Sequence, residues 1–286
     1  MYVNFRRLIA ACLAVSLATV FVGPAAAASK QPIKKLKHDP SIPSIELFEA
    51  MDQGVIETTV IAKDSHEANL FVTNKSDAPV SIQFPRAVVA TQVLKQFFPQ
   101  RGGLAGNGQQ QGGGGGMGAA QPVGGGMMGG GQNQGGGNNG MLNGNGNGFA
   151  NNNGVGNGNG FFSVPPQKTV QVSLKTVCLA HGKPDPRQRM KYQLVKLEDY
   201  SSDSVLHETL KLFASGAFET ETAQAAVWHL TDKMSWNDLK AKQIERIGLE
   251  PVPYFNEKHV EAAQKLVDEA RELAKETPRK AETAAR

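Results

Sequence analysis

The segment Thr169–Leu179, with the sequence TVQVSLKTVCL, is the clearest strand in this chain and indicates how the chain folds. Apolar and polar residues alternate along it, and a period of two places one set of side chains on a single face of a strand. That set ends in a cysteine and comprises Val170, Val172, Leu174, Thr176 and Cys178. A cysteine in phase with three aliphatic residues is most often a small buried hydrophobe. We therefore expect this face of the strand to pack against a core.

Further short runs rich in β-branched residues lie before and after a long polar segment. Before it, the sequence predicts a short helix over 44–53 and strands over 55–62, 68–73, 79–84 and 87–94. After it comes another strand over 190–197. Short strands at this spacing, with turn residues between them, predict an antiparallel, immunoglobulin-like β-sandwich.

From residue 201 the apolar period becomes helical. Capping residues and apolar stripes predict helices over 203–214, 220–230, 235–247 and 256–275. The predicted fold class is therefore α+β, with a β-sandwich followed by a small helical cap.

The polar segment is a glycine-rich insert over 102–160. It holds 27 of the 32 glycines of the chain and no charged residue. Such a composition buries too little apolar surface to offset its chain entropy, so we expect it to be disordered. Because the cost of closing a loop grows only with the logarithm of its length, the insert can replace a hairpin loop of one domain. Two half-domains joined by a linker are the alternative.

The N-terminus has the features of a cleaved signal peptide. Arg6 and Arg7 precede an apolar run over Leu8–Gly23, and the small residues Ala25–Ala28 follow it. We therefore expect an exported protein (periplasmic, at the cell surface or extracellular) with no stable membrane span after cleavage. The predicted organisation is a signal peptide over 1–28, an extended lead-in over 29–43, sandwich parts over 44–101 and 161–200 around the insert, a helical cap over 201–276 and a frayed tail over 277–286.

The composition limits the classes of function. The formal net charge is +4 and the pI is about 9.0, but no basic face is interleaved with aromatic residues. Nucleic-acid binding therefore has little support. Cys178 is the single cysteine expected in the mature chain, so the domain must be stable without an internal disulfide. No cofactor-binding motif is found.

Two segments, TVCLAHGKPDP at Thr176–Pro186 and AQAAVWHLTD at Ala223–Asp232, carry the residues with chemical potential. Together they resemble the thioester domains of bacterial surface adhesins. The resemblance implies a thioester between Cys178, as the thiol, and Gln224, as the acyl donor, which would capture an amine covalently. Val177 and Ala223 depart from the usual residues of that family.

Other interpretations of the same residues stay open. In the inert one, Cys178 is a core residue and Gln224 bonds a backbone group. In a metal site, Cys178 and His181 would be joined by His207 and His229 in a tetrahedral set. Nucleophilic catalysis by Cys178 with a histidine has no third, orienting group in the sequence.

The chain is also similar to uncharacterised secreted proteins of planctomycete-type bacteria. The similarity lies in the export signal, the insert, the segment Asn69–Pro85 (NLFVTNKSDAPVSIQFP), and the Val-Cys-Leu and Gln-Ala-Ala-Val-Trp-His segments. It implies the architecture and the compartment, and no mechanism.

We therefore expect an exported, non-enzymatic structural or interaction module of the cell envelope or surface, without a cofactor. Its partner would be an envelope or surface protein or polysaccharide, and the insert is a candidate for self-association. The thioester adhesin is the alternative.

Overall fold

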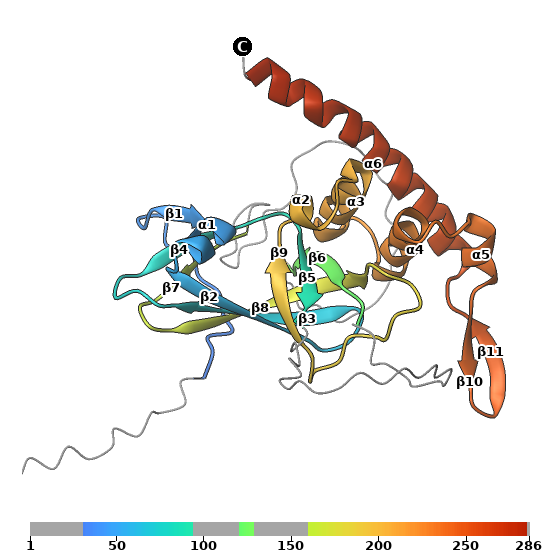
Figure 1. Ribbon diagram of the computed structural model, residues 1–286, viewed down its shortest axis with the longest axis horizontal. Coiled ribbons are helices and arrows are strands. Elements are labelled where there is room, and N and C mark those ends of the chain that lie inside the picture. Colours follow the sequence, from blue (N-terminus) through green and yellow to red (C-terminus); the bar gives the residue numbers. More distant parts are fainter. Residues whose placement is uncertain (1–30, 94–119, 129–159, 285–286) are drawn as a thin grey trace, which may run out of the picture. The chain divides into compact units, whose positions relative to one another are not determined.

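The computed structural model describes residues 31–93, 120–128 and 160–284 of the chain (Figure 1). All of them belong to one compact unit that begins at Gln31. The predicted signal peptide lies outside the described residues, as does most of the predicted insert.

Six strands form a closed barrel. Their order around it is β2 (Ile56–Ala62), β3 (Glu67–Asn74), β8 (Thr169–Cys178), β6 (Val123–Met127), β5 (Val88–Gln92) and β9 (Lys191–Val195). Each neighbouring pair is antiparallel. The α+β class is confirmed, whereas the immunoglobulin-like sandwich is wrong, because β9 pairs with both β5 and β2 and closes one sheet on itself.

The predicted disordered insert contains a strand of this barrel, so the prediction is wrong for residues 120–128. Strand β6 lies between β5 and β8, which come from opposite sides of the insert. Three of its five residues are Gly124, Gly125 and Gly126. A Cβ atom on Gly125 would lie 1.9 Å from the carbonyl oxygen of Lys175, and one on Gly126 would lie 2.3 Å from the Cβ of Ala214. Glycine is therefore required here by close approach rather than by flexibility.

A second, three-stranded sheet extends the barrel core. It consists of β1 (Ser44–Glu46), β4 (Val80–Phe84) and β7 (Gly160–Val164), with β1 parallel to β4 and β4 antiparallel to β7. Its buried residues belong to the same hydrophobic cluster as the barrel interior. Helix α1 (Leu47–Asp52) is shorter than predicted, because residues 44–46 form β1; the carboxylate of Glu46 caps it by accepting from the N–H groups of Phe48 and Glu49.

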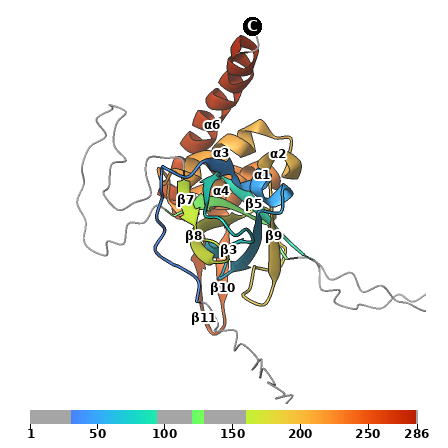
Figure 2. The ribbon, with the colours of Figure 1, turned by 90° about the vertical axis from the view of Figure 1, so that its left-hand side faces the viewer.

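Helices cover the outer face of β5, β6 and β8 (Figure 1, Figure 2). They are α2 (Leu197–Tyr200), α3 (Ser204–Ala214), α4 (Thr220–Thr231), α5 (Trp236–Ala241) and α6 (Glu257–Ala284). The side chain of Asp203 caps α3, and Ser235 and Asp238 form a capping box on α5. The apolar faces of these helices meet outward-facing barrel residues such as Val89 and Val177, and this forms a second core.

The third predicted helix, over 235–247, is wrong beyond Ala241. The chain instead forms a hairpin of β10 (Gln243–Arg246) and β11 (Leu249–Pro253). Gly248 lies in the hairpin turn with a φ of +71°, a conformation that glycine adopts without strain. The tail predicted to be frayed from residue 277 is helical up to Ala284 in α6.

The close approach of β6 to β8 yields a test of the barrel. Replacing Gly125 with alanine should lower the free energy of unfolding by about 3 kcal/mol, because backbone atoms of β8 cannot yield as a side chain can. Gly124→Ala is the matched control. Its Cβ would lie 3.0–3.1 Å from side-chain carbons of Leu210 and Leu179, so we expect a loss of only about 1 kcal/mol. Urea unfolding followed by circular dichroism measures both, and equal stability of Gly125→Ala and the wild type would contradict the placement of β6.

Candidate functional site

Strand β8 separates the two cores, and its last residue, Cys178, faces the barrel interior. Cys178 is 1% exposed and belongs to the cluster inside the barrel, whereas Val177 belongs to the cluster beneath the helices. This is the alternation expected of successive residues on a strand. The thiol is therefore enclosed by aliphatic side chains of the barrel.

The main chain of Cys178 is bound by the side-chain amide of Gln224 on α4. The N–H of Cys178 donates to Oε1 of Gln224 at 2.8 Å, and Nε2 of Gln224 donates to the carbonyl oxygen of Cys178, also at 2.8 Å. Strand β3 no longer pairs with β8 at this point, since its register with β8 ends at Lys175. Gln224, which is 1% exposed, takes the place of a strand there and satisfies both backbone groups.

Cys178 and Gln224 are thus brought together, but through the main chain and not through the thiol. A thioester needs the sulfur of Cys178 bonded to the side-chain carbonyl carbon of Gln224, with loss of ammonia. Here the amide lies on the backbone of β8, while the thiol lies in the barrel core. Burial also raises the pKa of the Cys178 thiol to about 12, so the reactive thiolate is scarce near neutral pH. The arrangement matches the inert interpretation, in which Gln224 joins α4 to β8.

The histidines proposed as metal ligands with Cys178 are engaged elsewhere. Nε2 of His181 lies 2.8 Å from Nζ of Lys242. Nε2 of His207 lies 2.7 Å from the carbonyl oxygen of Ser201, and Nδ1 of His229 lies 2.8 Å from that of Met234. Cys178, His181, His207 and His229 do not form a ligand set in the described part of the chain. The predicted metal site is therefore wrong.

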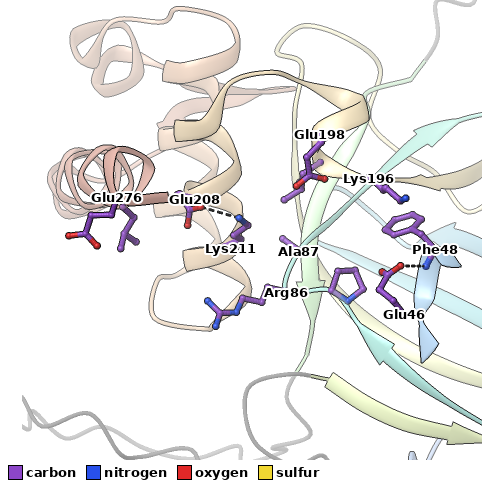
Figure 3. A pocket seen from close by; sticks show the side chains of 12 residues that line it. Glu46, Phe48, Arg86, Ala87, Lys196, Glu198, Glu208, Lys211 and Glu276 are labelled. Carbon is purple, nitrogen blue, oxygen red and sulfur yellow. Dashed lines mark hydrogen bonds and ion pairs between the residues drawn. The ribbon is translucent and has the colours of Figure 1, made fainter. Parts of the chain in front are cut away.

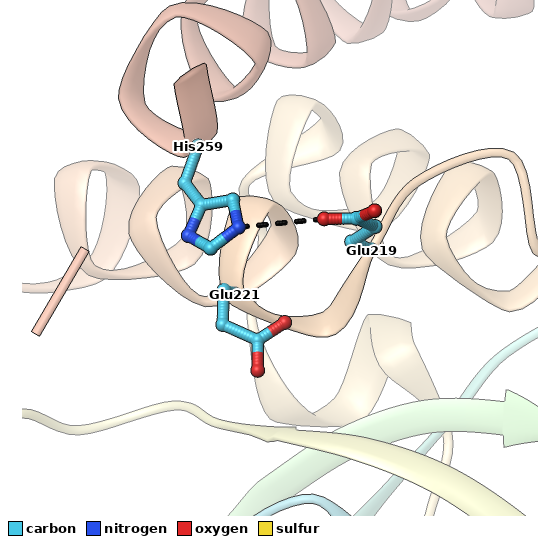
Figure 4. A group of neighbouring side chains, drawn as sticks. All are labelled: Glu219, Glu221 and His259. Atoms are coloured by element: carbon cyan, nitrogen blue, oxygen red, sulfur yellow. Dashed lines mark ion pairs between the residues drawn. The ribbon is translucent and has the colours of Figure 1, made fainter. Parts of the chain in front are cut away.

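A different trio, Glu219, Glu221 and His259, has ligand atoms within 4.8 Å of one another (Figure 4). Nε2 of His259 lies 3.4 Å from the carboxylate of Glu219. The trio lies where α4 begins at Thr220 and α6 begins at Glu257. The N-terminus of a helix carries a partial positive charge, which favours carboxylates and opposes a cation. We therefore interpret the trio as charge compensation at two helix ends. The sequence did not reveal it, because His259 is far from the glutamates along the chain.

A cleft of about 640 Å³ lies between α1, the connection from β4 to β5, α2, α3 and α6 (Figure 3). Apolar side chains such as Phe48 and Leu197 line it together with seven charged ones: Glu46, Arg86, Lys196, Glu198, Glu208, Lys211 and Glu276. Several of these charges have internal roles. Glu46 caps α1, Glu208 pairs with Lys211 at 3.0 Å, and Nζ of Lys196 lies 5.6 Å from the centre of the Phe48 ring.

The chemistry of this cleft is that of a surface depression with mixed charge. Its lining holds no cysteine, serine or histidine, so it offers none of the commonest pairs of nucleophile and base. Sequence patterns did not predict the cleft, because its walls come from segments as distant as Glu46 and Glu276.

The barrel interior does not hold a ligand cavity. The space bordered by Val60, Val88, Val123 and Leu174 is too small for a water molecule. The side chains of the interior therefore form a packed core, as in other small barrels that are filled by their own residues.

The hairpin β10–β11 projects from the helical layer (Figure 1), and its base is held by several contacts. The N–H of Tyr254 donates to the carbonyl oxygen of Lys242 at 2.8 Å, which joins the two ends of the hairpin. Nζ of Lys242 lies 5.4 Å from the ring centres of both Tyr254 and Trp228, and 2.8 Å from Nε2 of His181. Cation–π contacts of this kind and the hydrogen bond fix the base of the hairpin on α4.

The tip of the hairpin exposes apolar side chains. Ile247 in the turn is fully exposed and Leu249 beside it is 65% exposed, while Ile244, which pairs with Val252 nearer the base, is 43% exposed. With Val93, they are the exposed large apolar residues of the described chain. The turn is tightened by Arg246, whose guanidinium donates to the carbonyl oxygen of Glu250. A rigid base and an apolar tip are what a preformed contact element needs, since little conformational freedom is lost on binding.

No helix within the described residues is long and apolar enough to cross a membrane. Comparison with known proteins finds no matching family model, no matching curated protein and no matching solved structure. The resemblances to thioester adhesins and to secreted planctomycete-type proteins therefore stay predictions.

The contact between Gln224 and Cys178 can be tested by removing only the amide. Gln224→Met keeps the volume but leaves the buried N–H and C=O of Cys178 unpaired, so we expect a loss of about 2–4 kcal/mol of stability. Gln171→Met is the control, because Gln171 is half-buried and bonds the Asn69 side chain instead; its effect should stay below about 1 kcal/mol.

In the wild type, we expect the unmodified intact mass with or without methylamine, and no thiol labelling before unfolding. A mass lower by about 17 Da, as loss of ammonia requires, would instead indicate a thioester.

The base of the hairpin should loosen in acid. Burial, followed by the charge of Lys242, lowers the pKa of His181 below its ordinary 6.5. As the pH falls below 6.5, His181 binds a proton more readily in the unfolded chain than in the folded one. The stability that neutral His181 contributes is therefore fully present above pH 6.5, and it is lost as the pH falls to the lower pKa of the folded state. We expect the exchange protection of the Tyr254 N–H to fall between pH 7 and pH 5. His181→Phe should remove this change relative to the wild type, and an identical pH dependence in both proteins would refute it.

Proposed function

We propose that this protein is an exported, non-enzymatic interaction module of the cell envelope or surface, and that the hairpin β10–β11 is its contact element. The supporting observation is the hairpin, where Ile247 in the turn is fully exposed, Leu249 beside it is 65% exposed and Ile244 nearer the base is 43% exposed. Isolated exposed apolar residues are ordinary on protein surfaces, but three on one projecting hairpin with an anchored base favour a binding role. Export is inferred from the N-terminal sequence alone.

The chemistry of the tip favours a protein partner over a polysaccharide. Ile247 and Leu249 gain from contact with another apolar surface by about 25 cal/mol for each Å² removed from water. They offer no hydrogen bonds to sugar hydroxyl groups. The charged residues that flank them, Glu245, Arg246 and Glu250, suit the polar rim of a protein interface.

The absence of enzymatic activity in this proposal rests on where the reactive groups lie. Cys178, the nucleophile that the sequence suggested, is enclosed in the barrel core with a raised pKa. The histidines of the predicted site donate to or accept from other groups of the protein. The thioester alternative would need Cys178 to turn out of the barrel toward Gln224, and no contact in the structure favours that.

The hairpin is tested by removing its apolar tip in the full-length protein. Ile247→Ser combined with Leu249→Ser should leave the unfolding temperature within a few degrees of the wild type, because both side chains are exposed. The variant should lose most of its association with the envelope fraction of the producing cells. A photo-crosslinking amino acid at position 247 should join the wild-type chain to a discrete protein partner.

Glu245→Ser is the matched control, since this residue is exposed on the same hairpin but is polar. It should retain both the association and the crosslinked product. If the Ile247→Ser, Leu249→Ser variant stays in the envelope fraction as the wild type does, the hairpin is not the contact element.

A further inference from the structure

Strand β6 is attached to the rest of the barrel only through long connections. Residues 94–119 lie between Val93, which follows β5, and the segment 120–128 that contains β6, and residues 129–159 lie between that segment and β7. An extended chain spans about 3.3–3.6 Å per residue, so even the shorter connection can reach about 85 Å. That distance exceeds the width of a small domain. The covalent structure therefore permits β6 to reach a neighbouring molecule.

The place that β6 occupies is defined by two strand edges. On one side it pairs with Val88–Ala90 of β5, and on the other with Leu174–Cys178 of β8. Without β6, both edges would present unpaired backbone groups. Such edges are templates for another strand.

Contacts at the start of β6 fix which strand fits this place and in which register. The N–H of Gln121 donates to the carbonyl oxygen of Pro184 at 3.0 Å, and its Nε2 donates to that of Lys183 at 2.8 Å. The hydroxyl of Tyr192 donates to the carbonyl oxygen of Gln121 at 3.2 Å. The glycines that follow admit no side chain between Lys175 and α3. A second copy of this chain carries all of these features.

The strand itself buries few side-chain atoms. Val123 is its one large residue that is fully enclosed, and Gly124–Gly126 contribute only backbone. Its hold on the barrel thus rests mainly on backbone hydrogen bonds and on the polar contacts of Gln121. These interactions are the same whether β6 comes from its own chain or from another.

We propose that β6 is an exchangeable strand, which one copy of the protein inserts between β5 and β8 of a second copy. The partner is therefore another molecule of the same chain, and the product is a strand-swapped dimer or a longer series of molecules. A tethered β6 is present at its own barrel at an effective concentration on the order of 1 mM. Strands from other molecules compete with it more strongly as the protein concentration approaches that value, so exchange increases as the protein is concentrated. This inference does not depend on the hairpin and gives the self-association of the insert a structural basis.

The register of β6 with β8 provides the test. Val123 lies directly opposite Cys178, and the hydrogen bond from Leu179 N–H to Pro122 next to this pair marks it as a non-hydrogen-bonded pair. The Cα atoms of such a pair lie about 4.5 Å apart, within the range of a disulfide. A donor chain with Val123→Cys and Cys178→Ala can be mixed with an otherwise unmodified acceptor chain that keeps Cys178. A disulfide between donor position 123 and acceptor Cys178 forms only if the strand has crossed between chains.

The two chains, both without the predicted signal peptide over 1–28 that holds the second cysteine, Cys12, are unfolded together and refolded at 10 µM to 1 mM in a glutathione redox buffer. The oxidised glutathione takes up the two electrons of the two thiols, and exchange continues until native pairs are enclosed. We expect a disulfide-linked heterodimer whose yield rises at least tenfold over this range, with the 123–178 linkage identified by mass spectrometry. A donor with Lys63→Cys and Cys178→Ala is the collision control, because Lys63 is exposed; it should give less than a tenth of that product.

A second control shortens the connections. Deleting 96–117 and 131–157 from the donor should abolish the heterodimer, because four residues on each side of β6 cannot reach another barrel. In a single chain with the same deletions, Val123→Cys should still form the disulfide with its own Cys178. Exchange does not occur if two results are found together. The donor and acceptor without deletions stay monomeric at every concentration, and the Val123→Cys variant that keeps Cys178 forms the 123–178 disulfide within its own chain. Failure of that internal disulfide would also overturn the proposal, since it would remove β6 from beside β8.

Discussion

A close approach of backbone to backbone at β6 sets how the barrel and the helical layer pack together. This strand occupies a space that no residue larger than glycine can fill at Gly125, where β8 lies on one side, or at Gly126, where α3 lies above. Because β6 has almost no side chains, α3 packs directly on it, and the outer face of the barrel forms the floor of the second core. A bulkier strand would separate the two layers and leave both cores less densely packed.

The helical layer is joined to the barrel at a second point where a strand partner is missing. Where β3 ends, Gln224 hydrogen-bonds the open edge of β8 with both ends of its amide. A buried amide that meets a backbone N–H and a C=O in this way is specific in both position and orientation. It fixes α4 on β8 at Cys178, whose side chain lies in the barrel core.

These two constraints explain where binding potential remains. The barrel interior is full, Cys178 is enclosed, and the charges of the cleft serve largely to hold helices. The hairpin β10–β11 is different, because the network of Lys242, Tyr254, Trp228 and His181 holds its base while no residue that the structure describes covers its tip. Exposure of apolar surface on a rigid support favours recognition, and this reasoning underlies the proposed function.

Patterns among neighbouring residues were enough to predict most of the local elements. Alternation gave β8 with Cys178 on its buried face, and capping residues such as Asp203 and Ser235 gave the helix starts, since both depend on neighbouring residues. They also indicated that Cys178 and Gln224 act together, although the two residues meet through hydrogen bonds and not through the predicted thioester.

Contacts between distant residues were needed to show that the strands close into a barrel, that a glycine-rich stretch supplies one of them, and that residues 243–253 form a hairpin instead of a helix. In each of these cases the deciding contact joins residues far apart in the chain: Gly125 meets Lys175, and Lys242 meets Trp228 and His181. Local composition carries no signal for such contacts, so glycine was read as flexibility where it in fact permits close packing.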